Sequence, residues 1–520
     1  MSVAADRSFG RKSSGVDVER FSLKTFLARL RTAGELDEHD GPFDLADLGR
    51  HLKEQERAVL FRAVGPEKAT VVGNLAASRA RIAMAFDTTP DGLFAEVMRR
   101  LQHQPGTVEI GRDEAPVQEV VLTDEADLTR LPVHLQHGLD GAPYVSASMD
   151  IVKDPATGLT NVGMRRLMLR GRREAGVDLV SPSDLRAIYE AAARRGERTP
   201  VAFVVGSHPV DHIAAVMRLP IDEVGIIASL RDSPLPVVRC VTNDLLVPAD
   251  AEYVLEGYLD EAGHVEAEGP FGEFLGYYGG VKMNPVFHLT AITHRRDPVF
   301  QSSTIAGRRL DLTDTAQLCA VRTEVSVWRA LETAVREPLA IYATTSSGGM
   351  FNVRIAMRQR VPGEARNAIS AAMGCLANVK HVFVVDPDID IFSDAQMDWA
   401  LATRFQANRD LMVEEGFRTL PLDPSLGNAR TGAKAGFDCT LPLDLAARIE
   451  ARIPEAPSFE GERFDSIEAA LADGPKTFME LMVAVGSRDG REIVLSLDEI
   501  RQQGRLGRDG EGKWLIKEKP

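Results

Sequence analysis

Two glutamates in a glycine-rich segment are the residues of this sequence best suited to acid–base chemistry. Residues 267–280 hold Glu268 and Glu273 together with five glycines, one proline and four aromatic residues. Glycine permits left-handed backbone, and Pro270 fixes φ and lacks an N–H donor, so we expect a shaped loop here. Two carboxyl groups near aromatic rings can titrate apart and share acid and base roles. The same composition also fits a hairpin corner with two solvated glutamates.

Polar residues on a predicted hairpin and one glutamate beyond it could complete a site. Arg166 can bind a carboxylate through two parallel hydrogen bonds. Asn161 and Glu223 offer the hard oxygen ligands that Mg²⁺ and Mn²⁺ prefer. Asn161 and Arg166 are an odd number of residues apart, so a regular strand would point them to opposite faces. A bulge at Gly163 could bring both to one face, and the spacing alone does not show that they converge.

Other familiar motifs are missing or have a simpler interpretation. The sequence contains no Walker loop and no GxGxxG between a strand and a helix, so a P-loop or Rossmann domain is not indicated. Four aspartates between residues 386 and 394 lack the glycine and terminal glutamate of an EF-hand. They are more typical of a strand-end loop with helix-capping acids. Residues 302–304 have no paired His and Asp, so a hydrolase is not indicated.

The composition indicates a globular cytoplasmic protein whose main partners are neither nucleic acids nor membranes. The 520 residues carry a formal charge of −15, with 44% hydrophobic and 26% charged residues. A negative chain is repelled by phosphate backbones and anionic lipids. No apolar run approaches the roughly 18 residues that span a bilayer. Four separated cysteines suit a reducing compartment and give no zinc site: Cys240, Cys319, Cys375 and Cys439.

The elements that must position these residues belong to a middle domain rich in strands. Residues 140–320 contain alternating strands and few long helices, which predicts a β-barrel-like domain. Within it, the continuous apolar run over residues 201–206 predicts a buried strand. An α/β domain over residues 18–135 precedes the middle domain, beginning with an amphipathic helix that Ser22 can cap and Gly34 ends. A second α/β domain over residues 321–460 follows, because helices and strands alternate there, beginning with a helix over residues 321–335. Residues 1–17 read as a disordered lead, and residues 461–520 as a helical tail with two helices, near 466–472 and 475–484, and a charged end.

At the site residues the sequence resembles the UbiD-like decarboxylases, which use prenylated FMN. The resemblance runs over about residues 20–500. Its most specific motif is Glu268-Gly-Pro-Phe-Gly-Glu273 followed by Gly276-Tyr277. Further motifs match in order along the chain: Thr160-Asn161-x-Gly163-x-x-Arg166, residues 242–257, residues 384–390 and residues 399–404.

The resemblance implies the fold and a set of site residues. The fold would be an α/β N-terminal domain, a central split β-barrel flavin domain and an α/β C-terminal domain that assembles oligomers. A Glu–Arg–Glu network would fall on Arg166, Glu268 and Glu273. A divalent ion, Mn²⁺ or Mg²⁺, would bridge the cofactor phosphate, with K⁺ as a further candidate ion. The implied cofactor contacts are Asn161, Gly163, Arg166, Ser183, Met217 and Lys434, the last at the phosphate.

The implied metal site departs from the family at one ligand. Asn161 and Glu223 match two ligands, but the family's histidine, about eighteen residues after the arginine, is replaced by Asp184. An aspartate can bind a hard divalent ion and adds negative charge beside the phosphate. Ser183 or Asp184 could instead cap the helix that begins there, and the two roles are compatible.

The resemblance implies a reversible, non-oxidative decarboxylase of an aromatic, heteroaromatic or α,β-unsaturated acid. Arg166 would orient the substrate carboxylate, and Glu273 would donate the proton that replaces CO₂. Phe274 and Leu275 would shape the substrate pocket. We expect a homo-oligomer, a dimer or larger. The alternative is a non-catalytic flavin- or metal-binding paralogue, for which Asp184 would mark an altered metal site.

Overall fold

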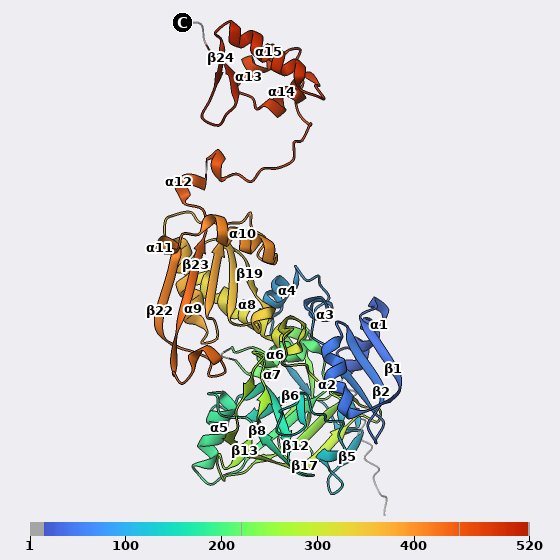
Figure 1. The fold of residues 1–520 in the computed structure, drawn as a ribbon. Helices are drawn as coiled ribbons and strands as arrows, with labels where there is room; N and C mark the ends of the chain where they lie inside the picture. The colour runs from blue at the N-terminus through green and yellow to red at the C-terminus, as the bar shows by residue number, and fades with distance from the viewer. Residues whose placement is uncertain (1–14, 220, 447, 518–520) are drawn as a thin grey trace, which may run out of the picture. The chain divides into compact units, whose positions relative to one another are not determined.

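The chain forms two compact units. The computed structural model describes residues 15–219, 221–446 and 448–517 (Figure 1), so most of the predicted disordered lead lies outside the described residues. One unit comprises the chain to Arg358 together with residues 363–439, and the other comprises residues 359–362 and 440 onward. Within the described residues, no helix is long and apolar enough to cross a membrane.

The N-terminal region is an α/β layer. It contains α1 (Leu23–Ala33), β1 (Leu36–Phe43), α2 (Leu45–Glu54), β2 (Ala58–Val64), β3 (Ala69–Gly73), α3 (Arg79–Ala85), α4 (Leu93–Arg100), β4 (Thr107–Glu109) and β5 (Val120–Leu122). Helix α1 begins and ends as predicted: Ser22 accepts a hydrogen bond from the Thr25 N–H, and Gly34 ends the helix with φ of 72°. The sheet order is β1-β2-β3-β18, so β18 (Val299–Gln301) returns to this region from far along the chain.

The middle region carries the barrel. Its elements are β6 (Tyr144–Lys153), β7 (Thr160–Leu169), β8 (Glu174–Val177), α5 (Asp184–Ala193), β9 (Thr199–Val205), α6 (Pro209–Val216), α7 (Glu223–Arg231), β10 (Leu235–Arg239), β11 (Leu246–Pro248), β12 (Tyr253–Leu259), β13 (Glu266–Glu268), β14 (Phe271–Gly272), β15 (Tyr278–Gly279), β16 (Lys282–Asn284) and β17 (Val286–His294). Strands β12-β9-β6-β7-β8-β17 pair in that order, and β12 also pairs with β17. This closed six-strand barrel confirms the predicted barrel domain.

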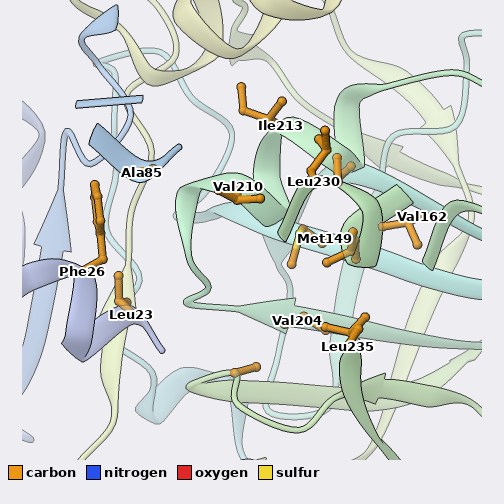
Figure 2. Close-up of a cluster of buried hydrophobic side chains, with 14 of the residues drawn as sticks. Leu23, Phe26, Ala85, Met149, Val162, Val204, Val210, Ile213, Leu230 and Leu235 are labelled. Atoms are coloured by element: carbon orange, nitrogen blue, oxygen red, sulfur yellow. The ribbon is translucent and has the colours of Figure 1, made fainter. Parts of the chain in front are cut away.

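Both faces of the barrel strands are covered, which explains their continuous apolar runs. In β9, Phe203 joins one buried cluster and the neighbouring Val204 joins another, as alternation along a strand requires. Figure 2 shows the cluster that contains Val204, in which Val210 and Ile213 of α6 lie beside the strands. Helices α6 and α7 are therefore fixed against the barrel, and the segment between them lies close to β7.

The C-terminal α/β region completes the first unit. It contains α8 (Asp314–Ala334), β19 (Pro338–Ala343), β20 (Asn352–Met357), α9 (Glu364–Cys375), β21 (His381–Val385), α10 (Asp394–Arg404), α11 (Ala407–Asp410), β22 (Leu411–Arg418) and β23 (Thr431–Cys439). The sheet order is β19-β20-β21-β23-β22, and β20, β21 and β23 run parallel. The α/β character predicted for this part of the chain is confirmed.

The second unit has its own small core. It contains α12 (Leu443–Ala446), α13 (Ile467–Asp473), α14 (Phe478–Val485), α15 (Arg491–Gln502), β24 (Leu506–Arg508) and β25 (Trp514–Ile516). The predicted helices near 466–472 and 475–484 are present as α13 and α14. The expectation of a charged tail after them is wrong, because α15 packs on the same core through Ile493, Leu497 and Ile500, and the β24–β25 hairpin packs against it through Leu506, Trp514 and Ile516.

Candidate active site

Arg166 lies between the two predicted glutamates. Its Nε donates to Glu268 Oε1 at 3.0 Å and its Nη2 to Glu268 Oε2 at 3.2 Å, a bidentate pair. Its Nη1 donates to Glu273 Oε2 at 3.1 Å. Glu268 is fully buried and Glu273 is 4% exposed. The structure thus assembles the Glu–Arg–Glu arrangement from β7 and from the glycine-rich segment, about a hundred residues later.

A strand irregularity in β6 lies opposite Arg166. The pairing of β6 with β7 shifts register between Val145 and Ser148, so that Arg166 lies opposite two residues of β6. At Gly163 the pairing is regular, with Asp150 opposite. The bulge predicted at Gly163 is therefore in the wrong place. Gly163 is needed for a steric reason instead, because a Cβ there would lie 2.9 Å from an oxygen of Asp150.

The glycine-rich segment is an irregular loop with short paired strands. Strand β13 pairs with β16, and β14 pairs with β15. Between β14 and β15 the Glu273 N–H donates to the Tyr277 carbonyl at 2.8 Å, and Gly276 has φ of 85°. Only glycine adopts this conformation without strain. The loop therefore holds the Glu273 backbone in one place, as the composition predicted.

Two further charged residues complete the arrangement, and sequence reasoning missed both. Asp178 Oδ2 accepts from Arg166 Nη2 at 2.9 Å and from Lys282 Nζ at 3.3 Å. Lys282 Nζ also lies 3.8 Å from Glu273 Oε1. Neither residue stands in an unusual stretch of sequence. Asp178 lies across from Arg166 because of the register in which β7 pairs with β8, and Lys282 belongs to the short strand β16.

The balance of charges raises the pKa of Glu273. Three carboxyl groups surround two cations, so full ionisation would leave one buried negative charge uncompensated. Burial raises the pKa of Glu273, and the nearby Asp178 and Glu268 charges raise it further, against the lowering effect of Arg166 and Lys282. Burial would also raise the pKa of Asp178, but Arg166 and Lys282 hold it below its ordinary value. Glu273 Oε1 is buried and has no hydrogen-bond partner among the described residues.

The predicted metal ligands lie near one another. Glu223 Oε2 accepts from Asn161 Nδ2 and from the Val162 N–H, both at 2.6 Å. Burial raises the pKa of Glu223 to about 7, and the charge of Asp184 contributes in the same direction. Asp184 is 65% exposed in its side chain and lies 3.5 Å from Arg218. Ser183, rather than Asp184, caps α5 by accepting from the Arg186 N–H.

These oxygen donors suit a hard divalent ion. The Asn161 amide presents its nitrogen to Glu223, and a metal would take the amide oxygen instead. Within the described ranges, no group of three or more His, Cys, Asp or Glu residues is arranged to hold a metal. A site here would therefore combine two carboxylates with an amide.

One cavity of about 310 Å³ connects these features. Its wall comes from β7, the α6–α7 connection, the glycine-rich segment, α8 and the loops of the C-terminal sheet. The predicted site residues on this wall are Asn161, Gly163, Arg166, Ser183, Asp184, Met217, Glu223, Glu273 and Phe274. The sequence thus identified residues from separate parts of the chain that line one cavity.

Three predicted site residues are not on the cavity wall. Glu268 lies behind Arg166. Leu275 is 8% exposed and lies near Gly348, where a Cβ would be 3.1 Å from its side chain. Lys434 Nζ donates to the carbonyls of Met373 and Leu376, at 2.6 and 2.7 Å. These carbonyls end α9, so the structure does not bring Lys434 to the cavity.

The cavity has the features that a phosphorylated flavin requires. It is lined by apolar side chains, such as Met164 and Leu318, and by separated polar groups at β7 and α8. The Arg322 Nε is buried and has no hydrogen-bond partner among the described residues. An unpaired buried cation on the wall fits an anionic ligand.

The structure has a closed barrel between two α/β regions and a buried arginine bound to two glutamates at a cavity. Comparison with known proteins shows that these features belong to a class of decarboxylase. Residues 27–101, 108–309 and 316–439 match the N-terminal, Rift-related and C-terminal domains of 3-octaprenyl-4-hydroxybenzoate carboxy-lyase. The chain belongs to the UbiD family, whose members are carboxy-lyases. The family match ends at residue 439, where the second unit takes over.

Named relatives and solved structures extend over most of the chain. Anhydromevalonate phosphate decarboxylase of Methanosarcina mazei is 32% identical over 84% of this chain and its own full length. Phenolic acid decarboxylase of Sedimentibacter hydroxybenzoicus is 28% identical over 81% of this chain and 92% of that protein. The UbiD-class enzyme HmfF of Pelotomaculum thermopropionicum, solved with FMN, has a TM-score of 0.79 at 32% identity, covering 84% of this chain and 97% of its own. An evolved dimeric form of HmfF was solved with prenylated FMN; it has a TM-score of 0.75 at 30% identity, over 84% and 97% of the two chains.

Proposed function

We propose that this carboxy-lyase is a reversible, non-oxidative decarboxylase of an aromatic, heteroaromatic or α,β-unsaturated carboxylic acid that uses prenylated FMN and a divalent ion. The observation that carries the proposal is the binding of Arg166 to both Glu268 and Glu273 at the cavity. The FMN and prenylated FMN in the HmfF structures support the choice of cofactor. When bound, the prenylated flavin supplies an electron sink for the pair of electrons that departing CO₂ leaves behind.

Arg166 has the position and charge to orient a substrate carboxylate. It lies on the cavity wall, and its contacts with Glu268 and Asp178 fix the plane of the guanidinium. The ring of Phe271 lies 4.6 Å from its Cζ, which adds a cation–π contact. A preorganised guanidinium loses little entropy when it binds a carboxylate.

Glu273 has the raised pKa that an acid catalyst needs. Burial makes its carboxyl group hold a proton to higher pH, and that proton can be transferred to the carbon from which CO₂ departs. In the carboxylation direction the resulting carboxylate would take the proton back. Arg166 and Lys282 stabilise that carboxylate, so that the group can return to the neutral state in each cycle.

The remaining residues of the cavity would hold the cofactor and the ion. Asn161, Asp184 and Glu223 would bind Mn²⁺ or Mg²⁺ through oxygen. Gly163, Ser183 and Met217 would contact the flavin. Phe274 would shape the substrate pocket. The rest of the wall is mixed in character and does not single out one acid.

We also propose that the protein is a homo-oligomer, a dimer or larger. Side chains of the C-terminal α/β region expose apolar area, with Phe392 44% and Trp399 42% exposed. Exposed aromatic groups of this kind are typical of protein interfaces.

The test is a screen of carboxylic acids with protein produced together with a supply of prenylated FMN. CO₂ release and H/D exchange at the product carbon are measured for aromatic, heteroaromatic and α,β-unsaturated acids. We expect a flavin absorbance that co-purifies with the protein, together with turnover of at least one acid class. Bound flavin without CO₂ release or exchange would instead support a non-catalytic flavin-binding paralogue.

A further inference from the structure

Arg322 is a mostly buried cation that no described residue neutralises. Within the described ranges, no hydrogen bond or ion pair reaches its guanidinium, and its Nε is buried without a partner. Burial lowers the pKa of Arg322, and the nearby charge of Arg218 acts in the same direction. Buried arginines are ordinarily paired with carboxylates, because an unpaired buried charge is costly.

Arg322 belongs to the face of α8 that lines the cavity. Thr315, Leu318, Cys319 and Arg322 all lie on the cavity wall, and their spacing of three and four residues places them on one side of the helix. Asn378, from the loop before β21, lies on the same wall. The arginine therefore faces a space in which a ligand can sit.

Arg218 is a second cation on the cavity wall, and it lies beside the proposed metal ligands. Its Nη1 lies 3.5 Å from Asp184 Oδ2, and its charge lowers the pKa of Glu223. Asn161, which donates to Glu223, is five residues from Arg166 along β7. At roughly 3.3 Å per residue, the two backbone positions are about 16 Å apart. The cavity thus has a carboxylate-binding end at Arg166 and a cationic end at Arg218 and Arg322.

We propose that Arg322, with Arg218, binds the phosphate monoester of the flavin at the cationic end of the cavity. This inference rests on the proposed function, since it assumes a flavin in the cavity. Guanidinium groups bind phosphate oxygens through paired, charge-assisted hydrogen bonds. The divalent ion at Asn161, Asp184 and Glu223 would share the same phosphate. This role falls to Arg322 and not to Lys434, whose ammonium is already occupied by two carbonyls.

The test compares FMN with riboflavin, which lacks the phosphate. Flavin fluorescence is titrated against the full-length apoprotein with Mn²⁺ present. We expect Arg322→Gln to weaken FMN at least tenfold and to change riboflavin less than twofold, and Arg322→Lys to recover part of the FMN affinity. The control is Arg329→Gln, an exposed arginine on the same helix, which should leave both affinities unchanged. Lys434→Met serves as a second contrast, and its FMN affinity should remain within twofold of wild type.

Three outcomes would overturn the proposal. In the first, the wild-type protein binds FMN no more tightly than riboflavin. In the second, Arg322→Gln weakens both flavins equally. In the third, Arg322→Gln weakens neither flavin while remaining folded by circular dichroism. The last result is expected if Arg322 binds a phosphate of the substrate and not the phosphate of the cofactor. The readout needs no turnover, so failure of the decarboxylation screen with an intact FMN preference would count against the proposed reaction and not against this site.

Discussion

At the scale of single residues, the proposed function depends on how three carboxyl groups share two cations. Arg166 contacts Glu268, Glu273 and Asp178, and Lys282 reaches the last two. Because buried groups of like charge disfavour each other's ionisation, one carboxyl group retains its proton more readily than the others. The raised pKa of Glu273 and the lowered pKa of Asp178 favour Glu273 for that role.

The pH dependence of turnover should report this sharing of charge. A neutral Glu273 is present below its pKa, so kcat for decarboxylation should fall as pH rises through that value. Asp178→Asn removes a charge that raises this pKa and should move the falling limb to lower pH, by about one unit. Lys282→Met removes a charge that lowers it and should move the limb to higher pH. The pH profile of kcat measures both shifts, and movement of both variants in the same direction would contradict this assignment.

Sequence reasoning identified the site residues that lie in a stretch of unusual composition. It missed those whose position in the site depends on which strands pair and in which register. Glu268 and Glu273 were found because their segment is unusual in composition. Asp178 and Lys282 lie in ordinary surroundings along the chain, and their importance follows from the register of β8 and β16. Arg322 belongs to a helix whose predicted beginning, at residue 321, is seven residues later than the observed one. Its position on the cavity-facing side therefore could not be predicted.

At the scale of elements, the glycine-rich segment positions Glu273 because its own backbone passes close to the Glu273 side chain. Strands β14 and β15 pair Phe271 with Gly279 and Gly272 with Tyr278, so that Gly279 passes beside the Glu273 side chain. A Cβ at Gly279 would lie 2.6 Å from Glu273 Oε1. Such a contact forces the carboxyl group to move, because no Cβ tolerates that distance.

Gly279→Ala should therefore impair catalysis with little effect on the fold. Displacement of a catalytic group by about 1 Å can cost about a hundredfold in rate, and we expect a fall in kcat of at least tenfold. Gly280→Ala is the matched control, since a Cβ there meets nothing within 4 Å. Steady-state kinetics and thermal melting of both variants provide the measurement. Equal activity of the two variants would show that the Glu273 position does not depend on this packing.

Helices and strands were predictable where the residues of the element itself carry a clear pattern. They were not predictable where the element depends on contacts with distant parts of the chain. The continuous apolar run of β9 and the capped helix α1 were predicted with small errors at their ends. Strand β18 has three residues and is defined only by pairing with β3. Helix α15 was missed, although Ile493, Leu497 and Ile500 have helical spacing, because the charged residues near both of its ends resemble a polar tail.

At the scale of the whole molecule, the cavity and the core of the second unit are built from different residues. All residues of the cavity wall belong to the first unit. The buried residues of the second unit form a cluster of their own, built from α13, α14 and α15. The relative from M. mazei matches over its full length within 84% of this chain. The family fold therefore needs no counterpart of the second unit.

Removal of residues 440–520 should leave catalysis intact. A domain with its own core contributes little to the stability of its neighbour. We expect kcat of the truncated, cofactor-loaded protein within about twofold of the full chain, and a melting transition within about 2 °C of it. Calorimetry of both proteins and the decarboxylation assay provide the comparison. Loss of flavin binding on truncation would show that the two units depend on each other.

The central claim is that Glu273 donates the proton that replaces CO₂, and H/D exchange tests it most directly. Glu273→Gln preserves the shape of the side chain and its contact with Arg166 but has no acidic proton. With the substrate found in the acid screen, the cofactor-loaded variant should retain its flavin and lose both CO₂ turnover and deuterium incorporation, by about a hundredfold or more. Full turnover and full exchange in the flavin-bound variant would contradict the account.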